Sequence, residues 1–246
     1  MKDKLSIIGV TLFGLAAAVG VSKVIPSHNI TRHIERAPIL RPVDENSVDI
    51  FIGIYSGDIK QTAKKYKIPP ELIAATLKSE NVGRPLYGDI EDIVGTFFGY
   101  DTTLGAGQVK ISTAQELDKE LFGRPVLRRE EIIRSLRNPS CNIEYMGKLY
   151  ASEMKAMSIK DPDALLLQPE SFVELASRYV GGRSHSSRLA ANAGLNTLSY
   201  LIDESTFRPF GRSYDKISEI IAATKRYMCS KASSNNLRIL RALGEC

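Results

Sequence analysis

Glu80 is the residue whose type and position suggest chemistry most directly. It falls near the end of a helix that the spacing of apolar residues predicts over Pro70–Asn81. Ile73 and Leu77 share one face of that helix with Glu80, so the carboxyl group is expected on a mostly apolar stripe. Desolvation and the negative end of a helix both raise the pKa of a carboxyl group, as a general acid at neutral pH requires. The other interpretation is a glutamate that ends the helix and points into solvent, and Thr76 on the same face makes the stripe less dry.

Helices joined by polar turns must position this acid, because the apolar pattern of the rest of the chain predicts a mainly α fold. The expected helices cover residues 46–66, 70–81, 112–121, 129–136, 138–154, 171–178, 187–202, 214–229 and 236–242. Ser112 and Gln115 form a capping-box pattern that is expected to start the third of these helices. Alternating strand patterns are scarce, so we expect at most a small β element near residues 101–109.

The composition is that of an ordinary globular protein and excludes several classes. The 246 residues are 43% hydrophobic and 25% charged, which argues against a mainly disordered, collagen-like or multi-span membrane protein. Three cysteines without a C-x-x-C pair, together with only three histidines, predict no metal site, and we expect no cofactor. The formal charge is +5, and it falls to +3 without residues 1–23, so it gives no support to nucleic acid as a partner.

Residues 59–78 also resemble a helix-turn-helix pattern, and four lysines lie in its first half. A DNA-recognition helix presents polar or basic residues at its N-terminal end. The second helix of this pattern begins with Pro70, Glu71 and Leu72, which present neither a basic nor a uniformly polar surface. We therefore expect no nucleic-acid partner.

The first 23 residues are expected to direct the chain out of the cytoplasm. Lys2 and Lys4 form a basic start, and residues 5–22 carry no charge. An uncharged run of 18 residues predicts either a cleaved signal peptide or a retained inner-membrane anchor. A linker over 24–45 and one domain with a C-terminal helical extension over 46–246 are expected to follow. The expected location is the periplasm or the cell envelope.

Four groups of motifs follow one another between residues 59 and 201. They are Ile68-Pro69-Pro70-Glu71-Leu72-Ile73-Ala74-Ala75 with Ser79-Glu80-Asn81, Gly105-Ala106-Gly107-Gln108-Val109 with Ser112-Thr113-Ala114, Asn138-Pro139 with Asn142-Ile143, and Tyr179-Val180-Gly181-Gly182. In this order they resemble the motifs of soluble lytic transglycosylases and goose-type lysozymes. The resemblance implies a lysozyme-like α or α+β domain with a small β element at the cleft. It also implies that the partner is the glycan strand of peptidoglycan.

The same resemblance assigns roles to individual residues. Glu80 would be the catalytic acid, and Tyr179 would place its hydroxyl near it. Gln108 would line the cleft, and the two glycines before it would let the backbone approach the sugar. Substrate contacts are implied for Ser79, Gly105, Gly107, Gln108, Tyr179 and Asp101. Taken alone, the glycines are equally typical of a plain turn, and Tyr179 is equally typical of a core aromatic residue.

The number of carboxylates decides which reaction is expected. A goose-type muramidase resembles an inverting enzyme, which needs a second carboxylate roughly 6.5–9.5 Å from the acid to activate water. Asp101 is the candidate, but Lys110 stands at the other position where those enzymes carry an aspartate. A lytic transglycosylase uses one glutamate as acid and then as base, while the 6-hydroxyl of MurNAc closes onto C1. This fits Glu80 better, so cleavage of the MurNAc–GlcNAc β-1,4 bond by a lytic transglycosylase is expected, with the muramidase as the alternative.

Three departures from the family pattern leave a third alternative open. Asn81 stands where a serine usually follows the glutamate, Ile111 replaces a proline, and Val180 replaces an asparagine. They are compatible with a catalytically weak protein that binds the wall or takes part in an envelope-spanning secretion or assembly machine.

The chain contains no tryptophan, which is the commonest stacking platform for sugars. Any ring stacking must therefore come from tyrosine or phenylalanine. Candidates are Tyr87, Phe97, Phe98 and Tyr100.

Overall fold

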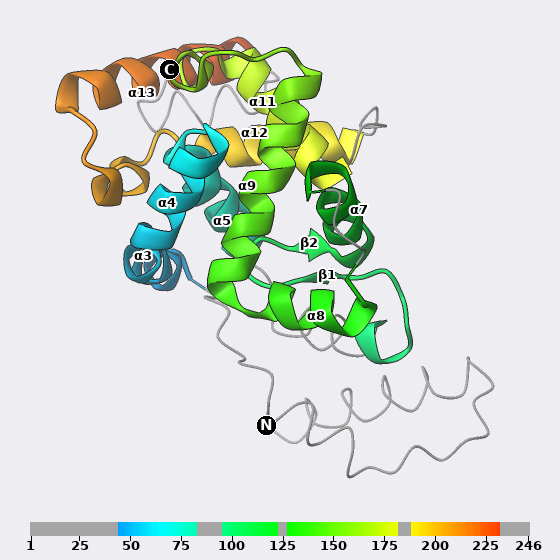
Figure 1. Cartoon of the computed structure of the whole chain (residues 1–246). Coiled ribbons are helices and arrows are strands. Elements are labelled where there is room, and N and C mark those ends of the chain that lie inside the picture. Colours follow the sequence, from blue (N-terminus) through cyan, green and yellow to red (C-terminus); the bar gives the residue numbers. More distant parts are fainter. Residues whose placement is uncertain (1–43, 83–94, 123–126, 182–187, 232–246) are drawn as a thin grey trace, which may run out of the picture. The chain divides into compact units, whose positions relative to one another are not determined.

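The fold is known from a computed structural model, which describes residues 44–82, 95–122, 127–181 and 188–231. These residues belong to one unit of the chain, Ile39–Cys246. They are mainly helical with one two-stranded sheet, which confirms the predicted mainly α class with a small β element (Figure 1). Among them, no helix is long and apolar enough to cross a membrane. The expected signal peptide or anchor over residues 1–23, nearly all of the linker, and the helix over 236–242 lie outside the described residues.

The prediction of a single helix over residues 46–66 is wrong, because the structure has two helices there. Helix α3 spans Glu45–Ile54 and helix α4 spans Ser56–Tyr66. They are separated at Tyr55, whose φ of −95° and ψ of 13° depart from helical values. Gly53 and Gly57 flank this position, and glycine weakens a helix, so the local sequence carries a signal for the break.

Helix α5 spans Pro70–Asn81, as predicted, and is the most deeply buried helix around the site. Pro70 occupies its first turn, where a missing N–H costs nothing. Every residue from 71 to 78 is buried, because α3, α4, α9 and α12 all pack against this helix. A helix covered on nearly all sides must provide buried partners for its own charged side chains.

The small β element lies where the sequence predicts it. Strand β1 (Thr103–Leu104) pairs antiparallel with β2 (Val109–Lys110), with Leu104 opposite Val109. Helix α7 (Ile111–Phe122) begins directly after β2, and α8 (Arg129–Arg137) follows. The predicted capping box paired Ser112 with Gln115 at the start of α7, but the structure pairs Ser112 with Asp101 instead. Ser112 donates from both its backbone N–H and its hydroxyl to the carboxylate of Asp101, at 2.9 and 2.7 Å, so a more distant residue caps this helix.

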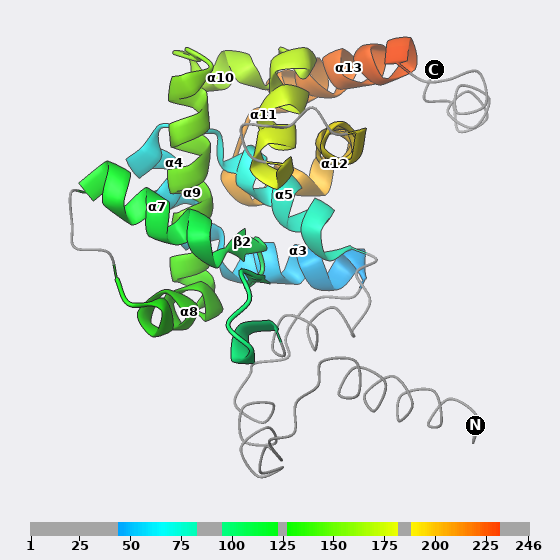
Figure 2. The ribbon, with the colours of Figure 1, turned by 90° about the vertical axis from the view of Figure 1, so that its right-hand side faces the viewer.

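The long helix α9 contacts helices from both earlier and later parts of the chain. Helix α9 (Pro139–Ala156) contacts α4, α5, α7, α8 and α11. The elements after it are α10 (Pro162–Leu165), α11 (Pro169–Gly181), α12 (Arg188–Ser199), the 3₁₀ helices η1 (Glu204–Thr206) and η2 (Arg208–Phe210), and α13 (Tyr214–Lys231). Helices α11 and α12 lie side by side, and both contact α13 (Figure 2).

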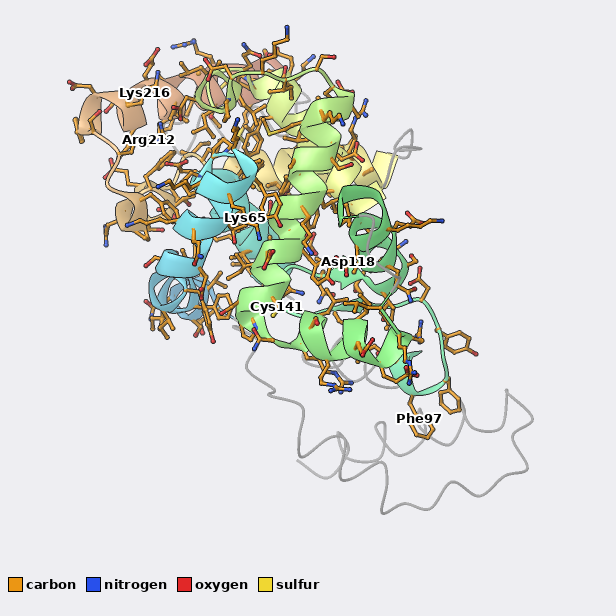
Figure 3. The ribbon with its side chains drawn as sticks, viewed as in Figure 1. Lys65, Phe97, Asp118, Cys141, Arg212 and Lys216 are labelled. Carbon is orange, nitrogen blue, oxygen red and sulfur yellow. The ribbon has the colours of Figure 1, made fainter. Side chains whose placement is uncertain are left out.

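Two of the three cysteines lie in the described residues, and they differ in their bonding. Cys229, near the end of α13, is disulfide-bonded. Cys141, in the first turn of α9, carries a free thiol (Figure 3). Cys246 lies outside the described residues.

Candidate active site

The last turn of α5 carries the predicted acid. Glu80 and Ser79 are partly exposed, whereas the eight residues before them are buried. The structure therefore lies between the two interpretations of the sequence, since the carboxyl group is neither enclosed in the core nor fully in solvent. The Ser79 hydroxyl accepts a hydrogen bond from the side-chain amide of Asn196 on α12, at 3.0 Å. This bond ties the last turn of α5 to α12.

Two stacked tyrosines lie beside Glu80. Tyr150 on α9 and Tyr179 on α11 have ring centroids 4.9 Å apart and an interplanar angle of 21°. The Tyr150 hydroxyl is hydrogen-bonded to the hydroxyl of Thr76 on α5, at 2.6 Å. Burial is the main reason that the pKa of each tyrosine is raised, and the charge of Glu80 raises both further. We call Tyr150 and Tyr179 the tyrosine pair; it brings α9 and α11 against the helix that carries the acid.

The segment between the two strands, residues 105–108, forms the glycine loop. The hydroxyl of Tyr179 donates to the carbonyl of Gly107, which joins this loop to the tyrosine pair. Gln108 is buried with a φ of 52°, and its side-chain amide donates to the carbonyl of Gly105 at 2.7 Å. Its side-chain oxygen accepts from the hydroxyl of Thr103 at 2.8 Å. The Gln108 side chain therefore holds the loop in shape, and a contact with substrate stays a prediction.

The two glycines of this loop are required by their immediate surroundings. A Cβ atom on Gly105, whose φ is 74°, would lie 2.2 Å from the carbonyl oxygen of Leu136. A Cβ atom on Gly107 would lie 2.5 Å from the sulfur of Met146. Since real Cβ atoms do not approach so closely, glycine at both positions lets the loop pack against α8 and α9. The predicted approach of these glycines to a sugar is not needed to explain them.

Asn142, buried in α9, fastens the glycine loop to the helices. Its side-chain oxygen accepts from the N–H of Gly107 at 2.7 Å. Its side-chain amide donates to the carbonyls of Leu104 and Leu136, at 2.9 and 3.0 Å. The sequence motif that contains Asn142 does not predict this role. All three partners are backbone groups in other elements, and only the fold brings them to Asn142.

Asn81 connects the last turn of α5 to the same loop. Its side-chain amide donates to the carbonyl of Leu77 in its own helix and to the carbonyl of Ala106 in the glycine loop, both at 2.7 Å. This is one of the positions where the chain departs from the resembled family. The asparagine that follows Glu80 nevertheless makes a direct connection between the acid's helix and the loop.

A buried lysine lies two residues before Glu80. The side chain of Lys78 is 0% exposed, and its ammonium group binds Asp203, Asp49 at 2.8 Å and Ser205 at 2.5 Å. Burial alone lowers the pKa of Lys78, but the hydrogen bonds to the two carboxylates outweigh it and the pKa is raised. We call these four residues the lysine cluster; it anchors the end of α5 to α3 and to the segment around η1.

Asp101, the candidate second carboxylate, lies at the start of α7. Its side chain is exposed, and both of its oxygens accept hydrogen bonds from Ser112 at the start of α7. A carboxylate in this position stabilises the N-terminal end of the helix, where the backbone N–H groups lack partners.

The arrangement brings Glu80, the tyrosine pair, the glycine loop and Asn81 together from four elements distant in sequence. Within the described part of the chain, no group of three or more His, Cys, Asp or Glu side chains is placed to hold a metal ion. When the chain is compared with known proteins, no family model and no curated protein matches it.

Proposed function

We propose that this protein is a peptidoglycan lytic transglycosylase with a lysozyme-like domain, which cleaves the MurNAc–GlcNAc β-1,4 bond with Glu80 as acid and then base. The observation that carries the proposal is the position of Glu80 itself. It is a partly exposed carboxylate at the end of a buried helix, beside the tyrosine pair, which is bonded to the glycine loop. The motifs that resemble the family are the segments that meet there.

The proposed reaction needs one carboxyl group used twice. Protonated Glu80 gives its proton to the glycosidic oxygen as the bond to C1 breaks. The resulting carboxylate then accepts the proton of the MurNAc 6-hydroxyl, whose oxygen forms a bond to C1. The product is a 1,6-anhydro sugar, and Glu80 returns to its starting state without water being consumed.

The surroundings of Asp101 favour this reaction over hydrolysis by a goose-type muramidase. Both oxygens of Asp101 accept hydrogen bonds from Ser112, which hold this carboxylate at the start of α7. A carboxylate that activates water must instead be directed at the substrate, on the opposite side of the scissile bond from the acid. The exposed Lys110 occupies the other position where goose-type enzymes carry an aspartate.

An exported location, in the periplasm or attached to the envelope, is part of the proposal. The disulfide at Cys229 supports it, because structural disulfides persist mainly in oxidising compartments. The uncharged run over residues 5–22 supports it independently. The proposed partner is the glycan strand, and association with an envelope-spanning machine belongs to the alternative of a catalytically weak wall-binding factor.

Cleavage of purified peptidoglycan sacculi by Glu80→Gln tests the proposal. The variant is expected to lose about a hundred- to ten-thousandfold in rate, the usual contribution of an acid–base residue. It should keep the melting temperature of the wild type, since Glu80 is partly exposed. Glu116→Gln, an exposed change on α7, is the matched control and should cleave normally. Full activity of Glu80→Gln would overturn the assignment of the acid, and an inactive wild type that still binds sacculi would favour the wall-binding alternative.

A further inference from the structure

Three aromatic rings are exposed together on the segment that leads into β1. Phe97, Phe98 and Tyr100 are 48%, 45% and 61% exposed, and the two phenylalanine rings meet edge to face with centroids 5.5 Å apart. Figure 3 shows Phe97 at the edge of the described fold near α8, pointing away from the helices. We call these three residues the aromatic turn. Exposed apolar groups gathered in this way mark contact sites.

The backbone of the aromatic turn is held by hydrogen bonds. The N–H of Tyr100 donates to the carbonyl of Gly95 at 2.9 Å, and the N–H of Gly99 donates to the carbonyl of Thr96 at 3.2 Å. With Gly99 at a φ of 81°, these two bonds form a Schellman motif, which ends a short helical turn. The guanidinium group of Arg129 on α8 also donates to the carbonyl of Tyr100. The backbone that carries the rings is therefore held in place, which lowers the backbone entropy lost when a ligand binds there.

The aromatic turn is joined to the candidate active site through the chain. Thr103 lies three residues after Tyr100, which limits their separation to about 11 Å. Its hydroxyl donates to the side chain of Gln108 in the glycine loop. Only a ligand long enough to extend past Thr103 could contact both the site and the rings, whereas a compact ligand at Glu80 would not need them.

The area of the rings favours a small, extended ligand over a folded protein. An aromatic side chain offers about 150–250 Å² when buried. Three rings about half exposed therefore offer roughly 300 Å², below the roughly 800 Å² per partner of a stable protein interface. The C–H faces of a sugar ring match the face of a phenyl or phenol ring, and no tryptophan exists in the chain to do this elsewhere.

We propose that the aromatic turn is a glycan-binding platform, on which a stretch of the wall polysaccharide beyond the cleaved bond stacks against Phe97, Phe98 and Tyr100. The proposal rests on the proposed function, because it takes the same glycan strand as ligand. It adds that recognition of the strand extends past Glu80, so that long strands bind more tightly than short fragments.

Binding of soluble, uncrosslinked peptidoglycan glycan strands to the full chain tests the platform. All proteins carry Glu80→Gln, so the strands stay intact. Phe97→Ala and Tyr100→Ala are each expected to weaken binding about three- to tenfold, the size of one lost stacking contact, while Tyr100→Phe binds like the parent. Tyr214→Ala is the matched control, because it removes a tyrosine 72% exposed at the start of α13.

The outcomes separate this proposal from the proposed function. Unchanged binding by Phe97→Ala and Tyr100→Ala, together with wall cleavage by the protein with Glu80 intact, would overturn the platform alone. If the parent binds no strands and the protein with Glu80 cleaves no wall, both proposals fail. If the alanine variants bind strands normally but abolish self-association measured by light scattering, the turn is a contact between copies and the platform is also overturned.

Discussion

Asn142→Ala should destabilise the protein strongly, because one buried side chain holds the glycine loop. The asparagine is fully buried and makes three hydrogen bonds, to the N–H of Gly107 and to the carbonyls of Leu104 and Leu136. A hydrogen bond contributes about 1 kcal/mol net, and a buried group left without a partner costs about 1–3 kcal/mol. We expect the free energy of unfolding to fall by about 3–5 kcal/mol, a large part of the roughly 5–15 kcal/mol typical of a domain.

Urea denaturation of wild type and variant measures this loss. Asn138→Ala is the control on the same helix, because it removes one exposed N-cap bond to the N–H of Cys141 and should cost only about 1 kcal/mol. The N–H of Gly107 should also exchange its hydrogen much faster in Asn142→Ala. A loss no larger than that of Asn138→Ala, with unchanged protection of Gly107, would refute the role given to Asn142.

The stability of the Asn142→Asp variant should depend on pH. The carboxylate keeps the acceptor for Gly107, but its second oxygen faces the carbonyls of Leu104 and Leu136, which repel it. The charged form is disfavoured in the folded state, so its pKa is expected above the unfolded value. The variant should therefore gain stability as pH falls and the acid regains a donor, whereas Asn142→Ala should show no such gain.

Three further predictions concern the same region. Lys78→Met should cost about 1–3 kcal/mol, because Asp49 and Asp203 lose a cation but are about one-third exposed and partly solvated. The folded pKa of Lys78 is raised and that of Asp203 is lowered. The difference from wild type in urea denaturation should therefore be largest between the ordinary pKa values of aspartate and lysine, and should shrink at both extremes. Equal loss at every pH would contradict this. Gly105→Ala should cost about 2–4 kcal/mol in thermal unfolding, because its Cβ meets a backbone carbonyl, whereas Gly53→Ala has open space and should stabilise α3 by about 0.5–1 kcal/mol. Asn81→Ala should slow wall cleavage by losing its bond to the glycine loop, and Asn81→Ser, the residue of the resembled family, should be less affected; equal rates for the wild type and both variants would show that the connection is dispensable.

Local signals in the sequence predict the elements around the site well. The bounds of α5 follow from Pro70 and the apolar period, and the hairpin follows from the glycines between β1 and β2. The break at Tyr55 lies between Gly53 and Gly57, which weaken a helix, and the two helices that it separates both pack against α5.

Interactions between distant segments explain what the sequence did not predict. Asp101 caps α7 from ten residues before it, although Ser112 and Gln115 look locally sufficient. Lys78 reads as an ordinary helix residue, and only the fold places Asp49 and Asp203 around it. Such partners become visible only when the elements are packed together.

The chemical form of the wall fragments tests the central claim most directly. Mass spectrometry of sacculi digested by the wild-type protein should find muropeptides ending in 1,6-anhydro-MurNAc, and Glu80→Gln should release none. Asp101→Asn should still give anhydro products, because that carboxylate caps a helix. Fragments with reducing ends only, lost on Asp101→Asn as fully as on Glu80→Gln, would contradict the account and identify a hydrolase that uses both carboxylates.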